Sequence, residues 1–167
     1  MDAEVEKEFS RFVAERTVAL LRVAYALTGD QHAAEDLVQT GLAKAMLKWR
    51  RIEGDPEAYV RRILFHEHIS GWRRRKRRPE TPMAVLPEPA DADRTDAAHL
   101  RILLREALLA LPPRQRAVIV LRYLEDRSEQ EVAELLGCRT GTVASQASRA
   151  LTKLRQLVPD QVTEAWR

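Results

Sequence analysis

Short polar and basic side chains line one side of a helix that the sequence predicts near the C-terminal end of the chain. From Thr140 onward, apolar residues recur at three- and four-residue spacings, as in an amphipathic helix. The opposite side carries Ser145, Gln146, Ser148, Arg149 and Lys153. Short polar groups can approach base edges in a DNA groove, and basic groups bind phosphates. The pattern therefore favours a DNA-recognition helix.

The residues just before this helix predict a second, shorter helix and a tight turn. Ser128 is a good N-cap for a helix that extends to Leu136, and Glu131 completes a capping box. Gly137 supplies a left-handed stop. Two short helices joined by a glycine-containing turn form a helix-turn-helix motif. An ordinary helical hairpin in an all-α domain is the alternative interpretation.

A second basic feature lies in the first half of the chain. A helix is predicted to open at Asp55 with Pro56 in its first turn, and it continues into six successive cationic residues, Arg73 to Arg78. A charge run of this kind can be a solvated face or tail. Because it directly follows an amphipathic helix, we expect it to face nucleic acid.

The remaining sequence predicts the elements that position these residues. With 45% apolar residues, 5% aromatic residues and 6 glycines among 167, the composition suits helices, and no strand pattern competes. Further helices are predicted over 3–27, 32–49, 96–111 and 114–124. Four prolines and several acids over 79–92 predict an extended linker. The expected fold is all-α, with two small helical domains joined by a Pro-rich acidic linker.

Gly41 falls in the middle of a predicted helix, where glycine costs about 1 kcal/mol relative to alanine. Close approach by another chain and close packing of helices within the domain both explain such a residue, and the sequence leaves the two open.

The charge distribution points to a polyanionic partner. Residues 1–78 carry 16 Lys and Arg against 12 Asp and Glu, residues 79–100 carry 1 against 5, and residues 101–167 carry 11 against 8. Two basic modules therefore flank an acidic connector. A single cysteine permits no internal disulfide, as is usual in a reducing cytoplasm. With no signal-peptide pattern and no run of about 20 apolar residues, we expect a soluble cytoplasmic protein without a membrane partner.

With these motifs in hand, the chain resembles the extracytoplasmic-function (ECF) sigma factors of bacterial RNA polymerase. The segment LPPRQRAVIVLRYLEDRSEQEVAELLGCRTGTVASQASRALTKLR resembles region 4 of that family. AAEDLVQTGLAKAMLKW resembles region 2.2, and DPEAYVRRILFHEHISGWRRRKRR resembles regions 2.3 and 2.4. The resemblance covers about residues 10–78 and 101–157. The compact layout is particularly similar to the small actinobacterial group related to SigE.

The resemblance implies a region 2 domain in residues 1–78, a flexible linker in 79–100 and a region 4 domain in 101–160. Such a chain would bind core RNA polymerase and direct promoter-specific initiation at −10 and −35 promoter DNA. It would have no catalytic activity, cofactor or metal. An anti-sigma factor stays open as a further partner.

The resemblance also assigns individual residues. A docking segment for the polymerase clamp maps to Asp36, Leu37 and Gln39, with Thr40 where housekeeping sigma factors usually have glutamate. The predicted −10 contacts are Arg51 and Ile52 in a base-receiving loop over 50–55, together with Arg61, Arg62, Trp72, Arg73, Arg74 and Arg75. The predicted −35 contacts are Arg139, Thr142, Ser145, Gln146, Ser148, Arg149 and Lys153. Because Ala144 and Gln146 stand where many relatives have cations, a relative's −35 sequence cannot be transferred.

Two other functions compete with this interpretation. A regulator with a helix-turn-helix alone would not need the first domain's docking face. An enzyme would have to use His66-Glu67-His68, but two histidines at i and i+2 diverge on a helix. The zinc-protease pattern needs histidine at position 70, which is Ser70. Cys138 is expected to pack in the turn.

Overall fold

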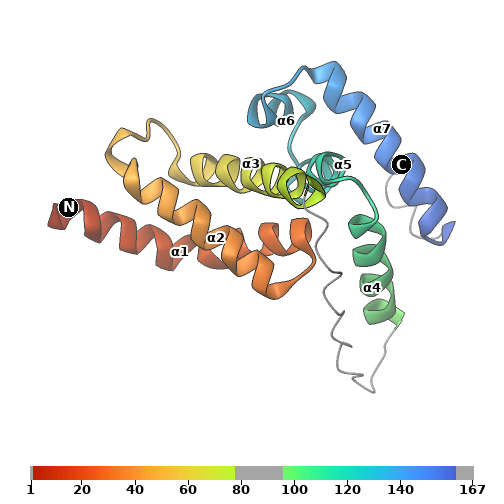
Figure 1. Ribbon diagram of the computed structural model, residues 1–167, viewed down its shortest axis with the longest axis horizontal. Coiled ribbons are helices and arrows are strands. Elements are labelled where there is room, and N and C mark those ends of the chain that lie inside the picture. Colours follow the sequence, from red (N-terminus) through yellow and green to blue (C-terminus); the bar gives the residue numbers. More distant parts are fainter. Residues whose placement is uncertain (1, 78–95, 161–167) are drawn as a thin grey trace.

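The computed structural model describes residues 2–77 and 96–160, and these ranges form helices without a strand (Figure 1). The elements of the first half are α1 (Ala3–Thr28), α2 (Gln31–Leu47), a 3₁₀ turn η1 (Trp49–Arg51) and α3 (Pro56–Arg77). Those of the second half are α4 (Asp96–Leu109), α5 (Pro113–Ile119), a π-helical turn η2 (Val120–Leu124), α6 (Glu129–Leu136) and α7 (Thr140–Leu157). The all-α prediction is confirmed. No helix in these ranges is long and apolar enough to cross a membrane.

The end of α1 and the starts of α2 and α3 lie close to where the sequence predicts them, and each has the expected cap. Gly29 ends α1 with a left-handed φ of 68°, and its N–H donates to the Tyr25 carbonyl at 2.7 Å. The Asp30 carboxylate accepts the Ala33 N–H at 3.0 Å and opens α2. The Asp55 carboxylate likewise accepts the N–H of Glu57 at 3.0 Å at the start of α3.

Close packing between α2 and α3 explains the mid-helix glycine. Gly41 is buried, and a Cβ placed there would lie 2.7 Å from Cδ2 of Leu64. Of the two explanations that the sequence left open, the structure supports helix packing within the domain. The apolar cluster around it comprises Leu20, Ala24, Ala34, Val38, Ala45, Val60 and Leu64.

The second helix is shorter than its apolar pattern predicts. The pattern included Trp49 in the helix, but α2 ends at Leu47 and Trp49 begins η1. The Trp49 ring packs against two rings of α1, with centroid distances of 5.0 Å to Phe9 and 5.1 Å to Phe12. Aromatic packing therefore accounts for the position of Trp49, which lies outside the regular α-helix.

The helix expected over 114–124 is in fact divided. α5 ends at Ile119, and a π-helical turn follows, in which the Glu125 N–H donates to the Val120 carbonyl at 3.0 Å. A π turn adds a residue to the helical circuit, so it changes the direction of the side chains that follow. Here Leu121 is buried while Glu125 reaches the first half of the chain.

The two expected bundles share part of their core. Val23, Leu27 and Phe65 of the first half belong to the same buried cluster as residues of α5, η2, α6 and α7. Figure 1 shows the ends of α1 and α3 meeting α5. A separate cluster joins α4, α5 and α7. α4 begins at Asp96, inside the predicted linker 79–100, and residues 78–95 lie outside the described part of the chain.

Candidate nucleic-acid interface

The helix-turn-helix forms by the capping interactions that the sequence predicts. The Ser128 hydroxyl accepts the Glu131 N–H at 3.1 Å, and the Glu131 carboxylate accepts the Ser128 N–H at 2.7 Å. The hydrogen bond from the Ser128 backbone N–H, the Ser128 side chain and the nearby Arg127 lower the pKa of the Glu131 carboxyl from its ordinary 4.5. Gly137 ends α6 with φ 67°. The predicted motif is confirmed.

Packing of α6 against α7 leaves one side of the recognition helix exposed. Val132, Ala133 and Leu136 of α6 share a buried cluster with Val143 and Ala147 of α7. The predicted −35 residues on the other side of α7 are accessible to different degrees: Ser145, Ser148 and Arg149 are exposed, while Thr142 and Gln146 are half-buried. Arg139, at the N-terminus of α7, is exposed. This surface can therefore meet base edges and phosphates.

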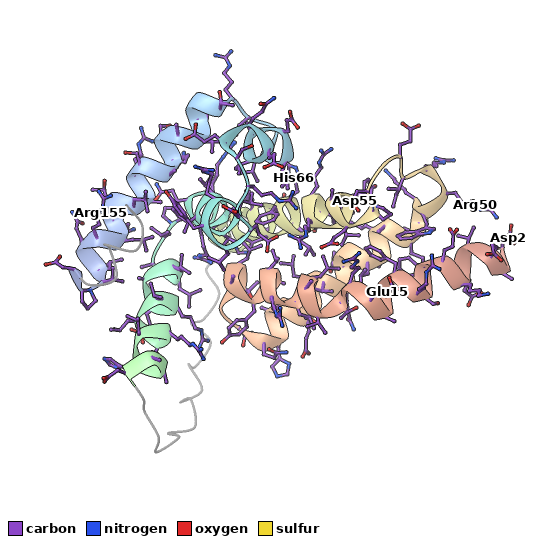
Figure 2. All side chains as sticks on the ribbon, turned by 180° about the vertical axis from the view of Figure 1, so that it is seen from behind. Asp2, Glu15, Arg50, Asp55, His66 and Arg155 are labelled. Atoms are coloured by element: carbon purple, nitrogen blue, oxygen red, sulfur yellow. The ribbon has the colours of Figure 1, made fainter. Side chains whose placement is uncertain are left out.

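The Lys153 side chain binds a distant segment of the protein. Its Nζ donates to the Ala110 carbonyl at 3.0 Å, which directs the ammonium toward the end of α4. Arg155, which the sequence analysis did not select, is exposed on α7 (Figure 2). It follows Ser148 by seven residues, close to two helical turns, so the two side chains share a face. That spacing is the signal by which Arg155 could have been found.

The first half has a hollow of about 480 Å³ between the C-terminal end of α2 and α3. Its lining is Lys44, Leu47, Lys48, Tyr59, Arg62, Ile63, His66 and Glu67. Lys48 and Arg62 are exposed and cationic, and Tyr59 supplies an aromatic ring. Of these residues, only Arg62 was predicted from the sequence to contact DNA. The missed signal was the four-residue spacing, about one helical turn, between Lys44 at the end of α2 and Lys48 at its C-cap.

The two loop residues predicted to receive a base do not line this hollow. Ile52 is half-buried against the core of the first half. Arg51 is exposed and lines a different hollow, shared with Lys48 and the N-terminal end of α1. In the same region Arg50 pairs with Asp2 at 2.5 Å (Figure 2). The loop therefore lies beside the cationic hollow rather than forming it.

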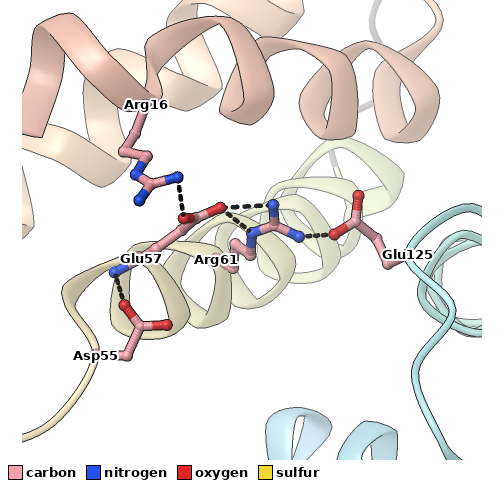
Figure 3. Close-up of polar contacts among 5 residues, drawn as sticks. All are labelled: Arg16, Asp55, Glu57, Arg61 and Glu125. Carbon is pink, nitrogen blue, oxygen red and sulfur yellow. Dashed lines mark hydrogen bonds and ion pairs between the residues drawn. The ribbon is translucent and has the colours of Figure 1, made fainter.

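Arg61 and Arg62, adjacent in the sequence, lie in different surroundings. Arg62 is exposed, whereas the Arg61 side chain is only 11% exposed. Nη2 and Nε of Arg61 donate to Glu57 at 2.7 and 3.1 Å, and Nη1 pairs with Glu125 of the second half (Figure 3). Glu57 also pairs with Arg16 at 3.3 Å. The predicted −10 face is therefore open at Arg62 and covered at Arg61.

The basic end of α3 is described only in part. The backbone is helical through Arg77, but the side chains of Trp72, Arg73 and Arg75 lie outside the described residues. Arg74 is 72% exposed and lies 3.7 Å from Glu67, which also pairs with Lys44. The one described arginine of the run is thus accessible to a phosphate.

The predicted polymerase-docking residues form a mainly exposed patch on α2. Asp36, Gln39 and Thr40 are exposed, and the Thr40 hydroxyl donates to the Asp36 carbonyl at 2.9 Å. Leu37 is half-buried and packs against two of the core clusters. Three of the four residues can therefore meet a partner directly, and the fourth supports the helix beneath them.

Comparisons with known proteins place both halves of the chain. Residues 13–78 match the family model for Sigma-70 region 2, and residues 101–154 match that for Sigma-70, region 4. The RNA polymerase sigma-E factor of Streptomyces coelicolor is 42% identical over 151 residues, covering 89% of this chain and 85% of that protein. The ECF RNA polymerase sigma factor SigL of Mycobacterium tuberculosis is 35% identical over 150 residues, covering 84% and 83%.

The chain belongs to the ECF family of sigma factors. A solved structure is also similar, that of the sigma factor RpoE in complex with the anti-sigma factor NepR from Bartonella quintana. The TM-score is 0.70 at 30% identity, covering 90% of this chain and 96% of that one. The resemblance seen in the sequence is therefore confirmed at the level of family and fold.

Membership of this family argues against a regulator built on a helix-turn-helix alone. A regulator built on a helix-turn-helix alone would not match region 2 over residues 13–78. In this sigma factor His66 is exposed and His68 is buried, so the two side chains do not converge. In the described ranges, three His, Cys, Asp or Glu side chains nowhere gather as a metal site would require.

Proposed function

We propose that this sigma factor binds core RNA polymerase and directs promoter-specific initiation by recognising −10 and −35 elements. The proposal rests on two cationic surfaces of one chain, one on each sigma region. They are the hollow between α2 and α3 and the exposed side of α7. A duplex that contacts both would be recognised at two separated elements.

The proposed division of labour follows the predicted domains. Region 2, in residues 1–78, would dock on polymerase through Asp36, Gln39 and Thr40 and bind the −10 element. Region 4, in residues 101–160, would bind the −35 element. The chain would act in the cytoplasm without catalytic activity of its own. An anti-sigma factor is a further partner that fits this role, as the relative from Bartonella quintana is in complex with one.

The hollow between α2 and α3 supports a role in −10 recognition. Its aromatic and apolar lining offers Tyr59 as a stacking surface, and its rim carries Lys48 and Arg62. Stacking of one base on an aromatic side chain contributes about 1–3 kcal/mol, and the two cations can hold the flanking phosphates. We propose that an extruded base of the −10 element enters this hollow, while Arg51 in the neighbouring loop contacts the backbone.

Transcription reconstituted from purified parts tests the proposal. Core polymerase and the full chain are combined with a library of genomic fragments, and run-off products are sequenced. We expect a defined set of start sites whose upstream sequences share two elements. Arg62→Ala should weaken transcription from these promoters, whereas Arg22→Ala, which removes an exposed arginine of α1, is the charge-matched control. The proposal fails if no promoter fires.

A further inference from the structure

The end of α2 carries the most exposed large apolar side chain of the described residues. Leu47, the last residue of the helix, is 81% exposed. One exposed leucine on a surface needs no explanation by itself. Four cations close to it along the chain are also exposed: Lys44, Lys48, Arg50 and Arg51. Proteins that unstack bases insert apolar side chains such as leucine between them, next to cations that hold the DNA.

Leu47 separates two hollows of similar size. The first is the hollow of about 480 Å³ between α2 and α3, which the proposed function assigns to an extruded base. The second, of about 390 Å³, lies between the end of α2, η1 and the N-terminal end of α1. Of the residues that line them, Leu47 and Lys48 line both. These two residues therefore stand between the hollows.

Each hollow also offers an aromatic ring. Tyr59 lines the first hollow and Trp49 the second. The Trp49 ring packs against Phe9 and Phe12 of α1 at centroid distances of 5.0 and 5.1 Å, so its position is fixed before a ligand arrives. Every base has a face that can stack on such a ring, and successive bases of a single strand stack on successive aromatic side chains.

The charges around the hollows match the backbone of a single strand. Arg62 is exposed at the first hollow, Arg51 at the second, and Lys48 at both. In the described lining, the carboxylate of each hollow is held in an ion pair with a basic side chain of the same hollow, Glu67 with Lys44 and Asp2 with Arg50 (Figure 2). The remaining charge is positive, as a phosphate backbone requires.

We propose that Leu47 is a wedge between two successive bases in the unpaired strand of the −10 element. The second hollow is then a further nucleotide site, which takes the base next to the one in the first hollow. This inference rests on the proposed function, because that function places an extruded base in the first hollow. Burial of the Leu47 side chain between base faces removes it from water, which offsets part of the cost of unstacking. Lys48 binds the phosphate that links the two bases.

The wedge is tested by changes at Leu47 itself. Leu47→Ala removes the wedge and keeps a good helix former at the end of α2. Leu47→Met keeps an apolar side chain of similar size. Val18→Ala is the matched control, since Val18 is a 62% exposed residue of α1 that lines neither hollow. All three variants should retain the helicity of the unaltered chain, because both positions are exposed.

The first readout is base stacking in a single strand whose central bases are all 2-aminopurine. Stacked neighbours of this base give a coupled circular-dichroism band that disappears when they are separated. The full chain is added to saturation in complex with core polymerase, or alone if core polymerase does not retain it. We expect the unaltered chain, Leu47→Met and Val18→Ala to reduce the band and Leu47→Ala to leave most of it. Equal reduction by Leu47→Ala and Val18→Ala, or no reduction by the unaltered chain, would overturn the proposal.

The second nucleotide site is tested by filling the second hollow. Val5→Trp enlarges a half-buried residue that lines this hollow and not the first, and Val18→Trp places the same side chain on the exposed surface of α1. We expect Val5→Trp to weaken binding of the single strand about tenfold, as the loss of one stacked base would, and Val18→Trp to leave it unchanged. Equal affinities would confine the strand to the first hollow and reject the second site.

Promoter opening by holoenzyme distinguishes a wedge from an ordinary DNA contact. On a duplex promoter, Leu47→Ala should open about tenfold more slowly than Val18→Ala, because the cost of unstacking is no longer offset. With mismatches across the −10 element the strand is already unpaired, and the two variants should form the complex at similar rates. Equal slowing on both templates would show that Leu47 contacts DNA without unstacking it and would reject the wedge. If no promoter fires, the proposed function fails, and the single-strand measurements still decide this inference.

Discussion

Replacing Arg116 should destabilise the junction of the two halves more than any neighbouring surface change. This arginine, 8% exposed, donates from its guanidinium to carbonyls at the ends of two helices. The acceptors are the carbonyls of Leu27 at 2.6 Å, Leu108 at 2.8 Å, Leu109 at 3.0 Å and Leu111 at 2.9 Å. Arg116→Met keeps most of the side-chain volume and removes every donor.

The magnitude follows from these contacts. A hydrogen bond to a charged group contributes about 1.5–3 kcal/mol, but the terms are not additive, because methionine also avoids the cost of burying a guanidinium. The change leaves buried carbonyl groups without their donor, which costs about 1–3 kcal/mol for such a group, and we expect a loss of about 2–4 kcal/mol. A small protein has a total stability of about 5–15 kcal/mol, so the loss is a large share of it.

Urea unfolding followed by far-UV circular dichroism measures this loss. Arg114→Met is the matched control, since Arg114 lies on the same helix, is half-buried, and forms no hydrogen bond or ion pair within the described part of the chain. We expect the midpoint to fall sharply for Arg116→Met and little for the control. Equal midpoints for the two variants would refute the argument that the carbonyl contacts stabilise the junction.

Three further predictions concern the proposed surfaces and the capping box. Asp36→Ala combined with Gln39→Ala should weaken binding to core polymerase by about 1–3 kcal/mol for each lost polar contact and leave the helicity unchanged. Fluorescence anisotropy measures this affinity, and an unchanged value would reject the docking face. In holoenzyme, Arg149→Ala should reduce discrimination among −35 sequence variants. Arg74→Ala should weaken binding to all promoters alike and reduce the slope of log affinity against log salt concentration by about one unit. Identical binding profiles of the two variants would reject the assignment of Arg149 to bases and Arg74 to phosphates. The Glu131 carboxyl should titrate below 4.5 in an NMR pH titration. Because the pKa of the folded state is lowered, the stabilising effect of the Glu131 carboxylate should be present above pH 4.5 and be lost as the pH falls through the folded-state pKa. A measured Glu131 pKa of 4.5 or higher would contradict the observed cap.

Local structure was predictable from the sequence because its causes are local. The capping box of Ser128 and Glu131, the left-handed Gly137 and the Asp30 cap all depend on residues within one turn of each other. Hydrophobic periodicity also gave the buried face of α7, and with it the exposed side that carries Arg149.

The contacts between the halves were not predictable in this way. Arg116 donates to a carbonyl 89 residues earlier in the chain, and no spacing rule connects the two. The π turn after Ile119 contains one more residue than an α-helical turn, so the Glu125 side chain points in a different direction from the one that a continuous α-helix would give. The apolar pattern of the sequence does not reveal this extra residue. The sequence placed Arg61 and Arg62 together on a DNA-binding face, but Glu125 of the second half covers Arg61 and leaves Arg62 exposed.

Binding of the full chain to purified core RNA polymerase tests the central claim most directly, because a sigma factor requires this interaction and a stand-alone DNA-binding regulator does not. Immobilised core polymerase should retain the chain in a one-to-one complex, and Asp36→Ala with Gln39→Ala should reduce the retained amount. Failure of core polymerase to retain the folded, unaltered chain would contradict the proposed function.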